Sequence, residues 1–343
     1  MNQIRGKSGR EIWIDACRGL GMLLVLLGHN QPPFVRWIYG FHMPLFYILS
    51  GYLFKRSHTE RSIREEAGIL CLRYILPYPV LAAVNLLIHT LHIMYVTPDH
   101  RFPFDRLREF IKGLILVYGP GREFCFPLWF LPSIAMALML FYLIRRCSLL
   151  WVRIAAFALS LAAAWIFFAN GRDLPFALHT IPIAVVFLEA GHLLRQLHLP
   201  ERAADRFAVL TFIAAASFGS AAVLFNPVER VDICLSNLGF VPLMLSGAVL
   251  LSFALMLGCC GIGKVAPAVL KPAAFIGKHT IFLLAFDIAS NDLGGTILKN
   301  FASEWPWYVS FLTRCLVLIV LFLIWQLLIH LIPSERIRKL VDY

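Results

Sequence analysis

The sequence has little charge: Asp, Glu, Lys and Arg make up 15% of its 343 residues, against about 25% in an average soluble protein. It also has no phosphate-binding glycine loop, no dinucleotide-binding glycine pattern and no Cys/His spacing typical of a zinc site. These absences argue against a soluble or disordered chain, a nucleotide-binding domain and a metal centre. The 31 Lys and Arg residues outnumber the 20 Asp and Glu residues, but they lie mostly in short loops. We therefore interpret them as topology signals and expect no nucleic-acid partner.

Apolar residues dominate instead. They account for 59% of the chain, and the mean hydropathy is +0.75. Runs of about 20 apolar residues recur along the sequence, which is the length of a helix that crosses a bilayer. We therefore predict an all-α polytopic membrane protein with about ten transmembrane helices in a single domain over residues 1–343. The predicted spans are 12–28, 37–54, 69–96, 127–144, 152–169, 176–194, 207–225, 238–260, 273–290 and 309–332.

Loop charge orients these spans. With the N-terminus in the cytoplasm, the inner loops and tails carry about twice as many Lys and Arg residues as the outer ones, so both termini are predicted to be cytoplasmic. The first apolar run resembles a signal peptide, but Asp15 and Arg18 interrupt it and no cleavage site follows, so we expect it to be retained. Within the long outer loop, LREFIKGLILVYG is too short to cross and predicts a re-entrant or interfacial helix. Cys125 and Cys234 both fall in predicted outer loops, where they either pair or stay reduced.

The first predicted span contains an arginine and a histidine on one helical face. Arg18 and His29 are eleven residues apart, which corresponds to about 16 Å of rise and three turns plus roughly 20°. Ionisable side chains inside a membrane are costly and often functional. The alternatives are a snorkelling Arg18 paired with Asp15 and an interfacial His29. His42 follows a short outer turn and should lie opposite His29.

Five sequence blocks carry a family resemblance. The first contains an arginine and a histidine separated by ten residues, Arg18 and His29, and the blocks are spread over nearly the whole chain. They are WIDACRGLGMLLVLLGH, FHMPLFYILSGYLF, LRYILPYP, PLWFLPSI and IGKHTIFLLAFD. On these residues the sequence resembles the membrane-bound acyltransferase 3 family, and within it the fucose 4-O-acetylase-like and exopolysaccharide O-acetyltransferases.

The resemblance implies an integral-membrane acyltransferase domain in a bacterial cytoplasmic (inner) membrane. Its expected reaction is transfer of an acetyl or similar acyl group from cytoplasmic acyl-CoA to a hydroxyl of a cell-envelope sugar or polysaccharide precursor. Acetyl-CoA is then a donor substrate, with no tightly bound cofactor and no metal. The expected partners are membrane lipid, acyl-CoA and a carbohydrate acceptor that is either free or lipid-linked.

The same resemblance suggests roles for the donor side. Arg18, with Arg73 and Lys278, would bind phosphate or pantetheine groups of the donor near the inner face. For Arg73 and Lys278 the alternative is snorkelling to lipid headgroups. His29 would take the proton of the attacking hydroxyl, because an imidazole titrates near neutral pH. An acyl-histidine intermediate is the alternative order of events.

On the acceptor side, His42 would hold His29 or contact the acceptor, or else pack. Trp129 would stack on a sugar face, or else form part of the aromatic belt, and Asp15 is a further supporting residue. Arg122 and Glu123 in the long outer loop would contact the acceptor, or else form a solvated ion pair. Many family members have a histidine where this chain has Asp287. A carboxylate cannot replace a neutral base or donor, but it can orient an imidazole.

Other intramembrane charges have simpler interpretations. Glu189, His192 and Arg195 suggest a charge-balanced helix face, Asp292 is a further acceptor candidate, and Arg314 is explained by snorkelling. A transporter or flippase of a glycan or lipid-linked intermediate is the alternative function. Such carriers often show repeated halves, which this sequence lacks.

Overall fold

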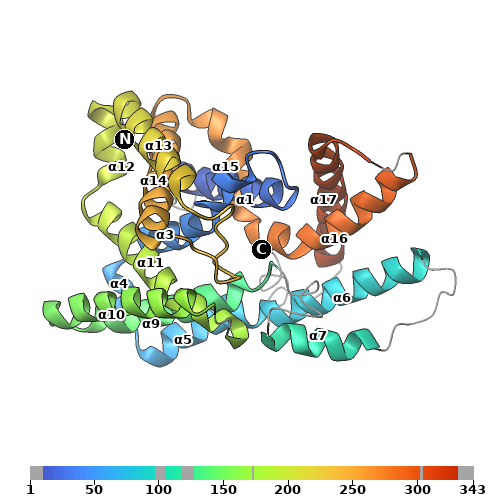
Figure 1. Ribbon diagram of the computed structural model, residues 1–343, viewed down its shortest axis with the longest axis horizontal. Helices are drawn as coiled ribbons and strands as arrows, with labels where there is room; N and C mark the ends of the chain where they lie inside the picture. Colours follow the sequence, from blue (N-terminus) through green and yellow to red (C-terminus); the bar gives the residue numbers. More distant parts are fainter. Residues whose placement is uncertain (1–10, 97–104, 117–126, 172–173, 302–303, 331–343) are drawn as a thin grey trace.

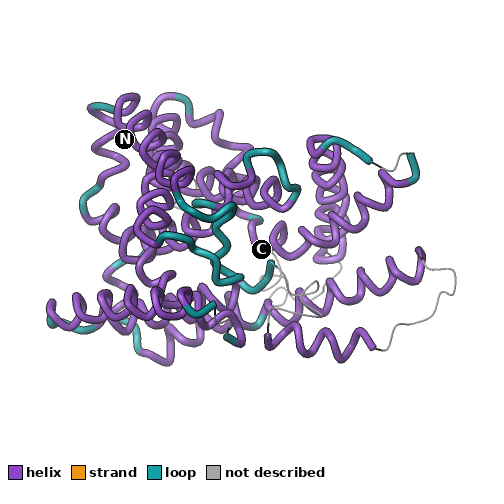
Figure 2. The backbone as a smooth tube through the Cα atoms, in the orientation of Figure 1, coloured by secondary structure: helices purple, strands orange, loops and turns teal. Residues whose placement is uncertain are grey.

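The computed structural model describes residues 11–96, 105–116, 127–171, 174–301 and 304–330. Within these ranges the named elements are all helices, and an isolated bridge joins Asp232 and Asn237 (Figure 2). The all-α prediction is confirmed. Eight of the described helices or helix pairs are long and apolar enough to cross a membrane, so the chain is a multi-pass membrane protein.

The helices are labelled as in Figure 1. In the first half of the chain they are α1 (Ile12–His29), α2 (Val35–Tyr39), α3 (His42–Leu53), α4 (Arg56–Thr59), α5 (Ile63–Leu70), η1 (Cys71–Ile75), α6 (Pro77–Val96), α7 (Asp105–Leu116) and α9 (Phe130–Arg146). In the second half they are α10 (Leu150–Ala169), η2 (Pro175–Thr180), α11 (Ile181–Gln196), α12 (Leu199–Arg206), α13 (Ala208–Phe225), α14 (Val241–Val265), η3 (Pro267–Leu270), α15 (Lys271–Lys278), α16 (Thr280–Lys299) and α17 (Trp307–His330).

Three predicted spans differ from the observed helices. The predicted span 37–54 is divided after Tyr39 into α2 and the 12-residue α3, and Gly40 between them packs against Val223, where a Cβ would lie 2.5 Å from the valine side chain. The span predicted at 127–144 is the 17-residue α9. The span predicted at 273–290 is broken at His279, where α15 ends and α16 begins in a new direction. The short outer-loop helix is present as α7.

Two helix pairs pack through glycines with their backbones nearly touching. A Cβ atom added at Gly191 of α11 would lie 1.9 Å from the carbonyl oxygen of Ile48 on α3, and one added at Gly277 of α15 would lie 1.8 Å from the carbonyl oxygen of Asp15 on α1. Small residues allow this close approach, which drives helix association where lipid removes the hydrophobic effect. These contacts hold α1 and α3 in the centre of the bundle.

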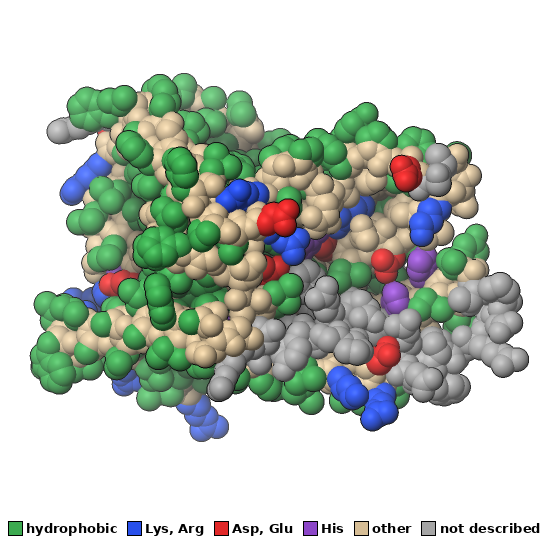
Figure 3. Space-filling model, viewed as in Figure 1, with side chains coloured by type: hydrophobic (Ala, Val, Ile, Leu, Met, Phe, Trp, Pro, Cys, Tyr) green, Lys and Arg blue, Asp and Glu red, His purple; other side chains and the backbone are tan. Residues whose placement is uncertain are grey.

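The outer helices turn apolar side chains away from the protein. In the most apolar 18-residue stretches of α10 and α17, only 11% and 17% of the residues are buried. Large exposed side chains on these helices include Trp151 and Leu323. Hydrophobic side chains cover much of the molecular surface in Figure 3, where one group of acidic and basic side chains lies near the middle and others stand towards the edges. This inverted pattern suits a protein surrounded by lipid.

Candidate active site

The central helix α1 carries one stripe of side chains that lines two neighbouring cavities. Arg18, Met22 and Val25 line the first cavity and His29 lines the second. These positions follow the i, i+4, i+7, i+11 spacing of one helical face. The structure therefore places Arg18 and His29 on the same side of α1, as predicted from the sequence.

A three-residue cluster stands at the end of this stripe. His29 Nδ1 lies 2.5 Å from Asp287 Oδ2, and the other carboxylate oxygen of Asp287 accepts a hydrogen bond from Arg314. The three side chains come from α1 near one end of the chain and from the consecutive helices α16 and α17 near the other. Because Asp287 accepts from Nδ1, the imidazole keeps Nε2 as its basic nitrogen. The geometry is that of a general base held by a carboxylate.

Arg314 is not a snorkelling residue, so that prediction was wrong. Arg314 is 4% exposed, and Asp287 beside it is 1% exposed. Arg314 also donates to Asn30 Oδ1, at 3.4 Å. A buried carboxylate without a counter-ion would be costly in the bilayer, and the guanidinium supplies that counter-ion.

His42 and Tyr39 complete the wall next to His29. His42 is buried, and its Nδ1 lies 2.9 Å from the carbonyl oxygen of Ile38, so this nitrogen is the protonated one. The ring centroid of Tyr39 lies 4.7 Å from that of His42 and 6.3 Å from that of His29. His42 therefore lines the cavity beside His29 with an aromatic ring packed against both imidazoles.

The second cavity, which we call the His29 cavity, has two lobes that share His29, Tyr39 and Asp232. One lobe is lined by His42 and by the buried Trp129. The other, of about 220 Å³, is lined by Asp287, Arg314, Arg230 and Asn291 among others. Trp129 thus reaches the predicted site as part of a buried wall. Arg122 and Glu123 lie outside the described residues, as does Cys125, so the predicted roles and the pairing with Cys234 remain predictions.

The loop 226–240 between α13 and α14 covers the His29 cavity and contributes Arg230 and Asp232. Arg230 lies over the Tyr39 ring, 4.5 Å from its centroid, and its guanidinium is 3.5 Å from Asp232 Oδ2. Burial raises the pKa of the Asp232 carboxyl above its ordinary value, although the Leu235 N–H and Arg230 oppose this shift.

The first cavity, which we call the Arg18 cavity, is basic. Arg18, Arg73, Ser50 and Tyr74 line both of its lobes, and the larger lobe, of about 330 Å³, also contains Arg61 together with His58 and Glu66. Arg18 and Arg73 therefore meet at one cavity, as the sequence predicted.

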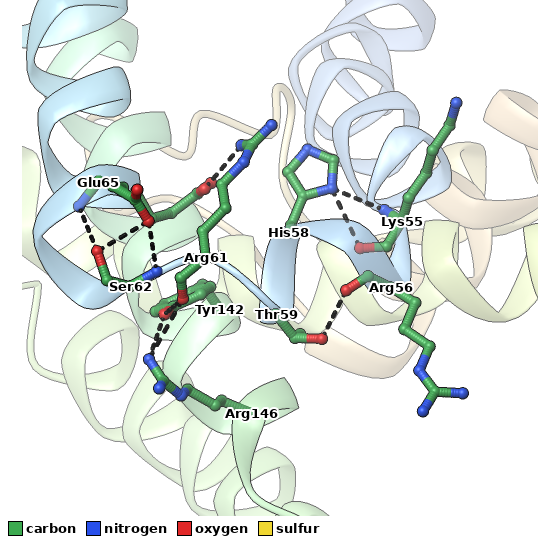
Figure 4. A network of polar contacts seen from close by, with 10 residues as sticks. Lys55, Arg56, His58, Thr59, Arg61, Ser62, Glu65, Tyr142 and Arg146 are labelled. Atoms are coloured by element: carbon green, nitrogen blue, oxygen red, sulfur yellow. Dashed lines mark hydrogen bonds and ion pairs between the residues drawn. The ribbon is translucent and has the colours of Figure 1, made fainter.

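The segment between α4 and α5 places Arg61 at this cavity. Tyr142 and Arg146 of α9 donate hydrogen bonds to the Arg61 carbonyl oxygen (Figure 4), at 2.8 and 3.4 Å. The Arg61 side chain pairs with the buried Glu66 at 2.8 Å. Ser62 caps α5 by accepting from the Glu65 N–H, which fixes where the helix starts.

Two other predicted site residues lie elsewhere. Lys278, at the end of α15, is exposed and lines neither cavity. Asp15 is buried in the contact between α1 and α15, with its carbonyl oxygen against Gly277. The structure therefore supports Arg73 more than Lys278 as a companion of Arg18.

The remaining intramembrane charges form separate clusters. Arg145 of α9 contacts Glu189 at 3.3 Å and His192 at 2.5 Å. The charge of Glu189 is therefore balanced by a neighbouring helix and not by the predicted Arg195, which donates to the Tyr52 carbonyl oxygen at 3.2 Å. His89 of α6 lies 3.1 Å from Asp292. Neither cluster lines the Arg18 cavity or the His29 cavity.

Sequence reasoning missed five side chains that the structure brings to the cavities: Tyr39, Arg61, Arg230, Asp232 and Arg314. One signal was present for Arg314, since it and Asp287 are opposite charges within two successive predicted spans, and intramembrane charges usually pair. The other four lie in loops or at helix ends, where a polar side chain is expected with or without a function.

The two cavities meet at Met43, which lines both of them. The Arg18 cavity and the His29 cavity therefore adjoin at this side chain of α3. A basic mouth at one end and an imidazole at the other suit a reaction between two substrates that enter from opposite sides.

Comparison with known proteins identifies the family. A family model described as "Acyltransferase domain" matches residues 11–341. The nodulation proteins NolL of Mesorhizobium japonicum and Sinorhizobium fredii are 29% and 31% identical over 85 residues. Each match covers 21% of this chain and 23% of the relative. No solved structure matches the chain. On the family match, which includes Arg18, His29 and nearly everything between the ends, the chain belongs to the membrane-bound acyltransferase 3 family.

Proposed function

We propose that this acyltransferase moves an acetyl or similar acyl group from acyl-CoA, bound in the Arg18 cavity, to a hydroxyl of a carbohydrate in the His29 cavity. Its place would be the inner membrane of a bacterium, and its acceptor a sugar or polysaccharide precursor of the cell envelope. Membership of the family supports acyl transfer. The observation that carries the proposal is the contact of His29 with the buried Asp287 beside a cavity.

The donor side is argued from charge. Arg18, Arg61 and Arg73 face the Arg18 cavity with Glu66 as the acidic partner, which leaves an excess of positive charge. The nucleotide end of acyl-CoA is highly anionic and cannot cross lipid, so it stays at this mouth, where guanidinium groups bind phosphate oxygens well. The slender pantetheine arm then runs along Met22 and Val25 towards His29.

The transfer step follows from the imidazole. The acceptor hydroxyl oxygen attacks the thioester carbonyl carbon while His29 Nε2 takes the hydroxyl proton. The carbon–sulfur bond breaks as the tetrahedral intermediate collapses, and the leaving thiolate receives the proton from the imidazolium. Asp287 stabilises the imidazolium through Nδ1, and Arg314 pairs with that carboxylate as its counter-ion.

The proposal is tested with purified protein in proteoliposomes, using acetyl-CoA labelled in the acetyl group and a set of methyl glycosides as acceptors. Label should move to carbohydrate, and His29→Ala should lower that transfer by about 10²–10⁴-fold. His330→Ala is the matched control, because His330 is an exposed histidine at the end of α17. Transfer that persists unchanged in His29→Ala would contradict the catalytic assignment.

A second test separates the acyltransferase from a carrier. Envelope glycan from cells with and without the gene is examined for ester groups. Loss of an ester with the sugar backbone intact supports acyl transfer. A flippase would give a different result. The whole glycan would be lost from the outer surface, and the glycan retained inside the cell would keep its esters.

A further inference from the structure

We propose that the loop 226–240 is the acceptor-recognition element, and that Arg230 and Asp232 bind hydroxyl groups of an uncharged sugar ring. This inference rests on the proposed function, since it names the part of the chain that holds the acceptor at His29. Neither side chain belongs to the sequence blocks that identify the family.

Hydrogen bonds within the loop 226–240 hold its conformation. The Asn226 side chain joins its two ends: Nδ2 donates to the Leu238 carbonyl oxygen and Oδ1 accepts from the Phe240 N–H, both at 3.0 Å. Gly239 has φ +65°, and a Cβ there would lie 1.9 Å from Asn226 Oδ1. Asp232 and Asn237 exchange backbone hydrogen bonds of 2.7 and 2.8 Å. The loop is therefore held as a closed unit, with its tip in a fixed position.

This unit faces the catalytic cluster. Arg230, Asp232 and Leu235 line the same lobe as His29, Asp287 and Arg314, and Asp232 also lines the lobe that contains Trp129 and His42. The golden trace between α13 and α14 crosses the middle of the molecule in Figure 1. An acceptor that reaches His29 from this side must pass the loop.

Charge balance selects the kind of acceptor. The larger lobe holds two arginines, Arg230 and Arg314, and two carboxylates, Asp232 and Asp287. With neutral imidazole the lobe has no net charge, so it gives no reason to prefer a phosphate or a uronate. A lobe that offers both carboxylate acceptors and guanidinium donors suits the hydroxyls of a neutral sugar, each of which can donate and accept.

Arg230 and Asp232 are arranged to take such a ligand. Their contact, at 3.5 Å, is long for a charge-assisted hydrogen bond, which is about 2.7–2.9 Å. The guanidinium is fixed over the Tyr39 ring, and Asp232 Oδ1 is fixed by the Leu235 N–H. A pair of adjacent hydroxyls can therefore bind with one hydroxyl donating to Asp232 and the other accepting from Arg230, at little cost in ordering the protein.

The experiment compares Asp232→Asn and Arg230→Gln with wild type in proteoliposomes. The acceptors are a neutral methyl hexoside and the corresponding methyl uronide. We expect either variant to raise the KM for the neutral acceptor about tenfold or more, while the KM for acetyl-CoA stays within twofold. Each variant also changes the net charge of the lobe, which should shift the preference between the two acceptors. The ratio of kcat/KM for the uronide to kcat/KM for the hexoside should rise in Asp232→Asn and fall in Arg230→Gln. Glu229→Gln, an exposed acid of the same loop, is the control and should change neither value.

A partial reaction separates this inference from the proposed function. Slow hydrolysis of acetyl-CoA without acceptor should be kept in the control Glu229→Gln and lost in His29→Ala, so it reports the proposed function apart from the loop. Unchanged acceptor KM and unchanged charge preference in Asp232→Asn and Arg230→Gln would overturn the role of the loop and leave the proposed function standing. Absence of acyl transfer by wild type to every acceptor would overturn both. Size-exclusion elution in detergent checks that each variant is folded, and Arg230→Gln changes a partly exposed side chain, so it tests the loop even if Asp232→Asn misfolds.

Discussion

The sharpest prediction concerns Asp287, which contacts both His29 and Arg314. The change Asp287→Asn keeps the size of the side chain and removes its charge. The amide can still meet the imidazole, but its NH₂ group favours the wrong tautomer of His29 and no longer stabilises an imidazolium. Arg314, which is 4% exposed, also loses its counter-ion.

Two magnitudes follow from this geometry. A positioned general base contributes about 10²–10⁴-fold, and loss of the orienting carboxylate in Ser-His-Asp triads costs about 10⁴-fold. We therefore expect kcat to fall by about 10²–10⁴-fold, or about 3–5 kcal/mol in the activation free energy. Leaving the buried Arg314 cation unpaired should lower the free energy of unfolding by about 3–5 kcal/mol as well.

The assay measures both quantities in the same preparation. Initial rates of label transfer from acetyl-CoA report kcat, and thermal unfolding in detergent reports stability. The double variant Asp287→Asn with Arg314→Gln removes the uncompensated cation, so it should recover most of the stability and none of the activity. If the double variant regains wild-type kcat, or if Asp287→Asn retains it, then the carboxylate has no part in the chemistry and its role is only to pair with Arg314.

Three further predictions concern other parts of the chain. Arg61→Gln should raise the KM for acetyl-CoA at least several-fold and leave the acceptor KM unchanged; an unchanged donor KM would remove Arg61 from the donor site. Gly191→Ala should lower the free energy of unfolding by at least about 1–3 kcal/mol, because the added Cβ would meet the Ile48 carbonyl oxygen. Gly261→Ala is the control, since a Cβ there meets open space, and equal melting temperatures of the two variants would contradict the packing argument. Burial raises the pKa of the Asp232 carboxyl, so the folded chain binds the carboxyl proton more tightly than the unfolded chain does. Wild type should therefore lose stability as pH rises from about 3.9 through the folded pKa, and the Tm of Asp232→Asn minus the Tm of wild type should increase over that interval.

The sequence predicted the helical membrane fold well because apolar runs of the right length leave few other structures. It could not predict where helices break within such a run. The breaks at Gly40 and at His279 both fall inside predicted spans, and Gly40 packs against Val223. Hydropathy is an average over about 20 residues and does not register these local contacts.

For the candidate site, helical periodicity was enough to put Arg18 and His29 on one face of α1. The partner of His29 could not be found in this way, because Asp287 and Arg314 come from helices more than 250 residues further along the chain. Residues in the loop 226–240 were harder still to predict. Arg230 and Asp232 have no periodic pattern, and their position depends on the Asn226 side chain that closes the loop.

Met43 has a consequence for the membrane as a whole. An enzyme whose two substrates arrive from opposite sides needs a route for the acyl group, yet an open water-filled route would let protons leak and dissipate any gradient held across the bilayer. The Met43 side chain stands where the two cavities meet, and its unbranched thioether swings aside more easily than a branched residue would. If the proposed function holds, this side chain would move aside for the acyl-carrying arm of the donor and close again behind it, which would keep the protein impermeable to protons between turnovers.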